Sequence, residues 1–473
     1  MKKKFFIFSL VIFVFLFLNY YAIQHLATKD GYISNKIRHN TPQFVKQYLK
    51  TINTKITGKI FIFKRYEEKK KENRQLKTRV LKVLNKVSLI DLKFDKEFIP
   101  EDTKLKLSKF KNNLFFDMGV RAYLAKDDHN IYIISGMGNL MYLPKNKILE
   151  KKELIFKKIN TNFFDLAIAP SKNIYHRNIV KNILIKNKKI YVSYYKKVND
   201  NCFYNSVLEG NLNIEKIEFK NFYDVNECQP FYDDNTAVGG NLADYKHNSI
   251  LMTIGGWDSY VRQKNQNPQN KNSLIGKVIS IDTSTGKSKM VSMGHRNSQG
   301  LFYDIHNDII YSTDHGPEGG DEINQHMNPN EKYIKNFGWA VSSYGEHYLS
   351  EEKWRNEDLY KRAPLNKSHQ KFGFEEPLKY FTPAIGITQI LKKNSFNNNI
   401  ENENRLYVGS MGWDLSEGDL GLHEIILDEE LKFKTSNFIP IGERVRDFLF
   451  LEDLKIFVMF LESDASIGIL QEM

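Results

Sequence analysis

The sequence has little cysteine and lacks the motifs of zinc sites and nucleic-acid sites. Cys202 and Cys228 are the only cysteines among 473 residues, so zinc-binding spacing is absent and cysteine has no basis for a metal or redox role. Basic side chains outnumber acidic ones by 69 to 56. Many of them lie near the N-terminus, and no aromatic and basic RNA-binding signature is present. We therefore expect no nucleic-acid partner.

The cysteine pair leaves two interpretations open. In an exported chain an even pair of cysteines can form a disulfide. The alternative is two buried free thiols.

Residues 1–23 lack a clear cleavage site. Lys2–Lys4 precede Phe5–Leu18, an apolar run broken by one serine. This charge and length fit either a signal peptide or an uncleaved signal anchor. Because Ala22 and Ala27 do not form a small-x-small site, we favour an anchor in the inner membrane. The basic end would be cytoplasmic, and the rest would lie on the periplasmic or extracytoplasmic face. Cleavage is the alternative.

Residues 24–104 form a basic connector. Between Arg65 and Lys86 the basic residues have few acidic neighbours. Apolar residues recur there at helical spacing, namely Leu76, Val80, Val83, Leu84 and Val87. The pattern predicts a helix with one apolar stripe, whose lysines are placed to contact anionic lipid heads. A solvated helix face is the commoner explanation of such a run.

Residues 105–473 repeat a pattern of an apolar strand, a polar turn and a second apolar strand. The second strands begin at Ile131, Ile190, Ile250, Ile309, Leu406 and Ile456, and the first three intervals are 59, 60 and 59 residues. Such a period, with about four strands per unit, is typical of a β-propeller. We predict an all-β, six-bladed β-propeller with an insertion within residues 325–380. A flat solenoid is the alternative, although no capping unit is visible.

The fourth repeat holds a hairpin flanked by polar residues. Leu301–Ile305 and Ile309–Thr313 are apolar and are joined by a three-residue turn. The residues before the first strand should therefore lie beside the loop after the second. We expect a pocket where Arg296, Asn297 and Gln299 face the loop at Gly316–Asp321; the alternative is a charged surface loop.

Three arginines are predicted to face one cavity. Arg296 offers a rigid fork suited to a carboxylate. Arg444 and Arg446 alternate by two at the start of the sixth repeat, so both point to one side of a strand. Three such charges are costly without an anion. The alternative is that each arginine pairs with a local carboxylate, such as Asp321, Glu322 or Asp447.

The loop from Gly316 to Glu322 supplies hard oxygen ligands. It combines backbone carbonyls at a tight turn with acidic side chains. Ligands of this kind suit Ca²⁺, although the spacing alone is a weak signal.

These segments carry a resemblance to a known family. The motifs are Gly294-His295-Arg296-Asn297-x-Gln299-Gly300-Leu301, then His315-Gly316-Pro317-x-Gly319-Gly320-Asp321-Glu322-Ile323-Asn324, and Phe337-Gly338-Trp339. Further matches are Ser273–Val278 with Asp282, and Arg444–Asp447. In these segments the chain resembles the soluble glucose/sorbosone dehydrogenase family, and in particular the pyrroloquinoline quinone (PQQ)-dependent aldose sugar dehydrogenases, which are six-bladed propellers. The resemblance covers residues 110–470.

The resemblance implies a cofactor site and a metal site. The tricarboxylate quinone PQQ would be held by Arg296, Asn297, Gln299, Arg444 and Arg446. The carbonyls of Gly316 and Pro317 would hold a Ca²⁺ that polarises the quinone. Glu322 would belong to a second, structural Ca²⁺ site.

The sequence departs from the family at the position of the general base. Ala237 stands where the family has a histidine, and no histidine occurs within residues 177–246. Asn241 stands where the family usually has arginine, and Ser410–Trp413 lacks the lysine expected to contact the quinone. Loss of a general base slows a reaction by roughly 10²–10⁴-fold.

Two hypotheses follow. The first is an exported, membrane-anchored PQQ- and Ca²⁺-dependent oxidoreductase of aldose sugars or related alcohols, with an altered base and an unknown catalytic residue. The second is a non-catalytic propeller that acts as a binding or scaffold module. A propeller-type hydrolase lacks support, because we find no nucleophile–base pair.

Overall fold

The computed structural model describes residues 89–101, 103–111, 121–150, 152–167, 178–231, 237–257, 266–329, 332–347, 357–393, 404–413 and 415–473. All of them belong to one compact unit, Glu72–Met473. The predicted anchor at 1–23 and the predicted helix between Arg65 and Lys86 lie outside these residues. Among the described residues, no helix has the length and apolar character needed to cross a membrane.

Strands make up most of the described chain, as the repeats predict. The largest sheet has nine strands in the order β26-β27-β28-β2-β1-β6-β5-β4-β3. In chain order these are β1 (Leu89–Phe98), β2 (Leu105–Lys111), β3 (Ala122–Lys126), β4 (Asn130–Ser135), β5 (Leu140–Pro144), β6 (Glu153–Lys158), β26 (Val445–Leu451), β27 (Ile456–Leu461) and β28 (Ser466–Glu472).

The next sheet has the order β12-β10-β9-β8, and β11 pairs with β7 beside it. The bounds are β7 (Asn160–Thr161), β8 (Val180–Lys186), β9 (Lys189–Asn199), β10 (Cys202–Asn211), β11 (Lys216–Ile217) and β12 (Lys220–Asp224). A five-stranded sheet follows with the order β13-β14-β15-β16-β20. It comprises β13 (Gly239–Tyr245), β14 (Ser249–Ile254), β15 (Lys277–Asp282), β16 (Ser288–Met293) and β20 (Lys335–Asn336).

Two four-stranded sheets complete the chain, with the orders β17-β18-β19-β21 and β22-β23-β24-β25. Their strands are β17 (Ser298–Asp304), β18 (Ile309–Asp314), β19 (Asp321–Met327), β21 (Lys379–Phe381), β22 (Ile387–Lys393), β23 (Arg405–Ser410), β24 (Gly421–Leu427) and β25 (Phe433–Pro440). The described helices are short: α6 (Phe163–Leu166), α7 (Gln266–Gln269), α8 (Glu357–Arg362), η1 (Lys145–Lys147), η4 (Gln370–Phe372) and η5 (Leu415–Glu417). The predicted insertion at 325–380 contains β20, α8, η4 and the start of β21.

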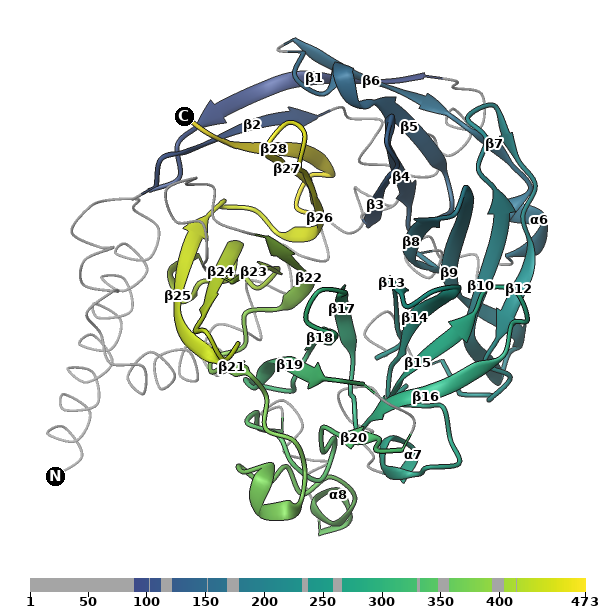
Figure 1. Ribbon diagram of the computed structural model, residues 1–473, viewed down its shortest axis with the longest axis vertical. Helices are drawn as coiled ribbons and strands as arrows, with labels where there is room; N and C mark the ends of the chain where they lie inside the picture. The colour runs from purple at the N-terminus through teal and green to yellow at the C-terminus, as the bar shows by residue number, and fades with distance from the viewer. Residues whose placement is uncertain are drawn as a thin grey trace, which may run out of the picture. The chain divides into compact units, whose positions relative to one another are not determined.

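The innermost strands of the sheets form a closed cycle. In chain order β3, β8, β13, β17, β22 and β26 each contact the next, and β26 contacts β3. Figure 1 shows the sheets radiating from the centre that these strands surround. The all-β, propeller-like fold is thus as predicted.

The first two strands join the ends of the ring. β2 pairs with β28, and β1 pairs with both β2 and β6, which links the last sheet to the first. The predicted boundary at residue 105 assigned 89–98 to the basic connector. The strand pairing of β1 places these residues in the sheet instead.

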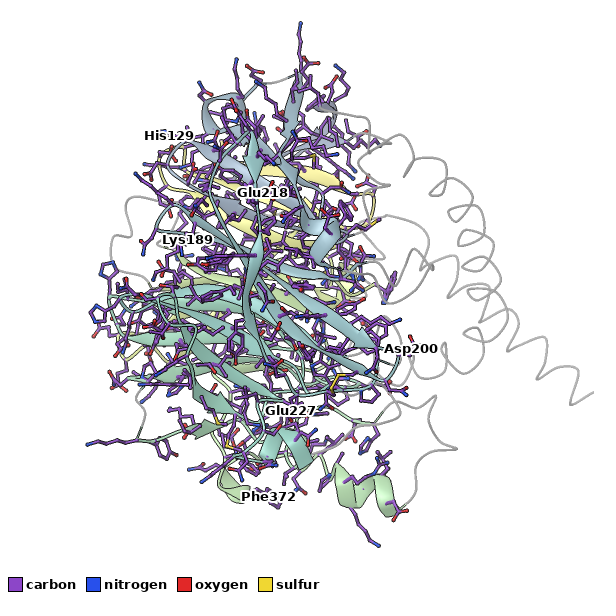
Figure 2. The ribbon with its side chains drawn as sticks, turned by 90° about the vertical axis from the view of Figure 1, so that its right-hand side faces the viewer. His129, Lys189, Asp200, Glu218, Glu227 and Phe372 are labelled. Atoms are coloured by element: carbon purple, nitrogen blue, oxygen red, sulfur yellow. A yellow bond between two sulfur atoms is a disulfide. The ribbon has the colours of Figure 1, made fainter. Side chains whose placement is uncertain are left out.

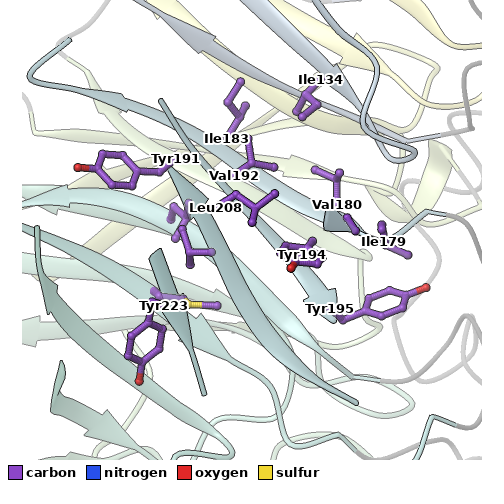
Figure 3. Close-up of a cluster of buried hydrophobic side chains, with 14 of the residues drawn as sticks. Ile134, Ile179, Val180, Ile183, Tyr191, Val192, Tyr194, Tyr195, Leu208 and Tyr223 are labelled. Atoms are coloured by element: carbon purple, nitrogen blue, oxygen red, sulfur yellow. The ribbon is translucent and has the colours of Figure 1, made fainter. Parts of the chain in front are cut away.

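The sheets are apolar on both faces because each lies between two neighbours. In β9, Ile190–Tyr195 are all buried, and in β27 all of Ile456–Leu461 are buried. Figure 3 shows one such interface, where Ile134 of β4 belongs to the same cluster as Val192 and Leu208. Burial of each such aliphatic side chain contributes about 1.5–3 kcal/mol.

Hydroxyl groups link successive sheets near the ring centre. Ser193, Thr253 and Thr313 lie 60 residues apart in sequence. Each donates a hydrogen bond to a carbonyl on the next innermost strand, with distances of 2.5, 3.2 and 2.5 Å to Gly240, Ser298 and Thr388. The repeat at sequence level therefore corresponds to a repeated contact between sheets.

The fifth sheet replaces this hydroxyl with a glycine. A Cβ at Gly409 would lie 2.3 Å from the Thr388 hydroxyl oxygen. The space left by the glycine admits Thr388, which donates to the Val445 carbonyl at 2.8 Å. A hydroxyl hydrogen bond therefore still joins the fifth sheet to the next one, but its donor lies on β22 and not on β23.

One disulfide joins Cys202 to Cys228 (Figure 2). It ties the start of β10 to the segment after β12. The structure therefore favours the first of the two interpretations of the cysteine pair.

We expect Thr253→Val to lower the free energy of unfolding by about 1–3 kcal/mol. The hydroxyl of Thr253 also accepts the backbone N–H groups of Gly240 and Asn241, so valine leaves buried polar groups without partners. Chemical denaturation would measure the change. Thr435→Val on the exposed face of β25 is the control and should have little effect; equal stability of both variants would contradict the role of the hydroxyl.

Candidate functional site

The carboxylate of Asp314 fixes the polar segment before β17. Ser298 lies opposite Asp314 in the β17–β18 pair. Asp314 accepts the backbone N–H groups of Arg296 at 3.1 Å and Asn297 at 2.6 Å, and the hydroxyl of Ser298 at 2.9 Å. His295 Nδ1 lies 3.0 Å from the same carboxylate. The hairpin thus brings the segment before β17 to the end of β18, as its pattern predicts.

Arg296 lies against the loop that follows β18. Its Nη1 donates to the carbonyls of His315 and Gly316, each at 2.9 Å. The guanidinium carbon is 5.2 Å from the centroid of the Trp339 ring, close enough for a cation–π contact. The predicted proximity of Arg296 to the Gly316 loop is therefore present in the structure.

The two predicted amide side chains connect neighbouring inner strands. Asn297 Oδ1 accepts the N–H of Gly239 at 3.3 Å and Nε2 of Gln299 at 2.9 Å. Asn241, which stands at the family's arginine position, donates from Nδ2 to the Gln299 carbonyl at 2.6 Å. These bonds hold β13 and β17 together at the ring centre.

The predicted arginines at the start of β26 share a buried carboxylate, Glu462. Arg446 donates from Nε to Glu462, and Arg444 Nη2 lies 3.4 Å from its other oxygen. Arg444 also donates to the carbonyls of Met411 and Gly412. Arg446 Nη1 reaches Oε1 of Gln299 at 3.5 Å, which connects β26 with β17.

Glu462 was not identified from the sequence. It directly follows β27 and stands 16 positions after Arg446, with no motif around it. The sequence instead suggested three other acids as possible partners of the arginines, namely Asp321, Glu322 and Asp447. A search for acids at the end of the strand that pairs with β26 would have found Glu462, because an antiparallel partner ends beside the start of its neighbour.

The three acids that the sequence suggested have other partners. Asp447 accepts the Leu124 N–H at 2.7 Å, and Asp321 accepts three or more backbone N–H groups, including those of Ile385 and Ile387. Burial raises the pKa of both carboxyls to about 7. Glu322 lies 3.2 Å from Nε2 of His369.

The arginines control the ionisation of their neighbours. Burial alone would raise the pKa of Glu462, but the charges of Arg446, Arg444 and Arg121 outweigh this effect and lower the pKa to about 2. Removal from solvent and the charges of Arg296, Arg446 and Arg444 lower the pKa of His315 to about 3. At neutral pH Glu462 is therefore ionised and His315 is neutral.

The predicted Ca²⁺ ligands are engaged within the protein. The Gly316 carbonyl accepts a hydrogen bond from a guanidinium, and Glu322 faces a histidine, so neither presents an open ligand set. Pro317 is buried in the same loop. Within the described ranges, no group of three or more His, Cys, Asp or Glu side chains is placed to hold a metal. A Ca²⁺ site at Gly316, Pro317 and Glu322 therefore stays a prediction from the resemblance.

Ala237 has no side chain capable of proton transfer and is 1 % exposed. Its carbonyl accepts the backbone N–H of Trp257 at 2.8 Å. At the third departure from the family, Ser410–Trp413, the Trp413 side chain is 82 % exposed, and the guanidinium carbon of Arg444 lies 4.6 Å from the centroid of its ring. An aromatic–arginine pair therefore stands where the resemblance predicts a lysine.

We expect Glu462→Gln to lower the free energy of unfolding at neutral pH by about 3–5 kcal/mol, because it leaves two buried arginines without a counter-charge. Glu430→Gln, at an exposed pair with Lys432, is the matched control and should leave it almost unchanged, because solvent screens an exposed ion pair.

The effect of Glu462→Gln should also depend on pH. The folded-state pKa of about 2 lies below the usual value of 4.5. The stabilisation by Glu462 is therefore full above pH 4.5 and is lost as the pH falls towards 2. Denaturant unfolding of wild type and variant across this range would measure it; a pH-independent difference would contradict the assignment.

Comparison with known proteins gives the site a family context. The family model described as Glucose / Sorbosone dehydrogenase matches residues 179–469. An uncharacterized Synechocystis protein, slr1608, is 27 % identical over 230 residues, which cover 44 % of this chain and about half (50 %) of that protein. The aldose sugar dehydrogenase YliI of Escherichia coli is 22 % identical over 302 residues, covering 60 % of this chain and 72 % of that protein.

Solved structures share the fold. A glucose dehydrogenase aligns with a TM-score of 0.59 at 18 % identity, covering 78 % of this chain and 99 % of the other. The soluble aldose sugar dehydrogenase of Escherichia coli, in its apo form, aligns with a TM-score of 0.59 at 16 % identity, covering 78 % and 100 %. The PQQ domain of the Coprinopsis cinerea pyranose dehydrogenase aligns with a TM-score of 0.50 at 8 % identity, covering 80 % and 97 %.

The family match covers more than half of the chain and includes the β17–β18 hairpin, the Arg444–Arg446 pair and Glu462. The chain belongs to the glucose/sorbosone dehydrogenase family.

Proposed function

We propose that this chain binds PQQ at the centre of the ring and is an oxidoreductase of aldose sugars or related alcohols. The observation that carries the proposal is the set of arginines at one site. Arg296, Arg444 and Arg446 come from two innermost strands, and Glu462 is the carboxylate that neutralises two of them. Positive charge in excess of the protein's own carboxylate suits an anionic ligand.

The residues present fit the charge of a tricarboxylate. Arginine forks can bind carboxylates through two parallel hydrogen bonds. Asn297 and Gln299 present amide groups between the arginines of β17 and β26. When bound, the quinone would accept the hydride from the carbon that bears the substrate hydroxyl.

The chain's own residues would mainly bind and orient the ligand, and they would contribute little to proton transfer. Asp314 holds the backbone of Arg296 and Asn297 in place, which fixes the direction of both side chains. His315 is neutral, but the low pKa makes its ring a weak proton acceptor. With Ala237 in place of the family's histidine, we expect turnover roughly 10²–10⁴-fold slower than in a site with a general base.

Calcium is kept as a prediction from the resemblance, and no step of the proposal depends on it. Before Gly316 could bind a cation, the guanidinium of Arg296 would have to leave its carbonyl. Two like charges at a few ångströms repel each other.

The fold and location complete the proposal. We propose six blades, because six innermost strands contact one another in a cycle. We also propose export, with residues 1–23 as the anchor in the inner membrane. The Cys202–Cys228 disulfide supports export, because disulfides persist mainly in oxidising compartments.

A non-catalytic binding module is the second candidate. The observation that favours it is Ala237, which removes the proton acceptor without closing the arginine site. Such a protein would bind the ligand and leave sugars unoxidised.

We expect purified protein to bind PQQ in an absorbance titration and to oxidise an aldose slowly with an artificial dye acceptor. Arg296→Ala should abolish both, because it removes one of the three arginines of the proposed anion site, while Arg362→Ala on α8 should change neither. Absence of PQQ binding at micromolar cofactor would refute the proposal. Binding without oxidation of any aldose would support the non-catalytic candidate.

A further inference from the structure

Arg121 is a fourth arginine at the ring centre that no motif identified. It directly precedes β3, and its carbonyl accepts the N–H of Gly136 at 2.6 Å. β3 contacts β26, and the contact includes the 2.7 Å bond from the Leu124 N–H to Asp447. Arg121 stands three residues before Leu124, and Arg444 stands three residues before Asp447. Arg121 therefore lies directly before the innermost strand β3, as Arg444 lies directly before its neighbour β26.

Arg121 adds charge to a cluster that already has more cations than anions. Glu462 is bonded to Arg444 and Arg446, and the field of Arg121 also acts on it. Three guanidinium groups thus act on the Glu462 carboxylate, and burial raises the pKa of the neighbouring Asp447 to about 7, so that acid offsets their charge only in part. The excess is positive, and a cluster of this kind favours a further anion.

The Arg121 side chain is half-buried and has no ion pair or hydrogen bond with any residue in the described ranges. Arg444 and Arg446, by contrast, are held by carbonyls, Glu462 and Gln299. Within the described residues, the packing of the protein therefore gives no reason for a partly buried guanidinium at this position. The alternative is that only water solvates the Arg121 guanidinium.

Arg121 and Arg296 lie on opposite sides of the ring. In the cycle of innermost strands, β3 and β17 are separated by two strands in either direction. Figure 1 shows β3 and β17 facing each other across the centre. A ligand that reaches both arginines must carry acidic groups at both ends.

We propose that Arg121 binds a carboxylate of the ligand beside Arg444, Arg446 and Glu462, so that the site takes a planar polycarboxylate spanning from β3 to β17. That the ligand is PQQ rests on the proposed function. That the ligand is a polycarboxylate follows from the positions of the arginines and does not need that function.

Isothermal titration calorimetry with two probes tests the inference. The probes are PQQ and 1,2,4-benzenetricarboxylate, a smaller aromatic tricarboxylate. Arg121→Gln should weaken binding by about 10- to 100-fold, as expected for one charged hydrogen-bonded contact. Arg121→Lys keeps the charge and should lie between wild type and Arg121→Gln. Arg362→Gln on α8 is the matched control, and thermal unfolding of each variant shows that it is folded.

The outcomes separate the inference from the proposed function. If wild type binds PQQ and Arg121→Gln binds it equally well, the inference is wrong and the proposed function stands. If wild type does not bind PQQ, the proposed function is wrong, and the inference is then tested by the binding of benzenetricarboxylate to wild type and Arg121→Gln. Binding of that probe that depends on Arg121 supports it; binding that does not depend on Arg121, or no binding of either probe, overturns it.

Discussion

Each sheet of this protein is apolar on both faces, and this constraint determines the arrangement of the rest. A sheet of this kind is stable only between two neighbours, and a row of such sheets leaves no exposed end only when it closes on itself. Closure brings the first residues of every innermost strand to one centre. Arg121, Asn297 and Arg446, which are far apart in sequence, lie around this centre because β3, β17 and β26 belong to one closed cycle of innermost strands.

Charge at this centre is balanced within the protein only in part. Glu462 orders two arginines and keeps them from repelling each other, while Asp314 positions a third through its backbone. Carboxylates buried beside them are bonded to backbone N–H groups, and burial raises the pKa of Asp321 and Asp447 to about 7, so these acids offset the arginine charge only in part. The site is thus rigid and remains positive, which favours recognition of an anion by a preformed surface.

The sequence predicted those features that depend on local pattern. The period near 60 residues predicted the repeated sheets. The apolar runs Leu301–Ile305 and Ile309–Thr313, joined by a short turn, predicted the β17–β18 hairpin with Arg296 beside the Gly316 loop. The partners of Arg444 and Arg446 depend on which strands pair, so Glu462 was missed in favour of nearer acids. β1 was assigned to the connector because its residues, Leu89–Phe98, alternate with many charges and belong to no repeat.

The pairing of β2 with β28 has a consequence for how the chain reaches its native state. β2 is synthesised early and β28 last, so this contact joins residues more than 350 positions apart, such as Leu107 and Leu470. Contacts at such separation form slowly, because the whole intervening loop must first be ordered. Until β28 is available, β2 presents an unpaired strand edge, which is a common starting point for aggregation. A chaperone that shields the N-terminal strands would protect this fold at its most vulnerable stage.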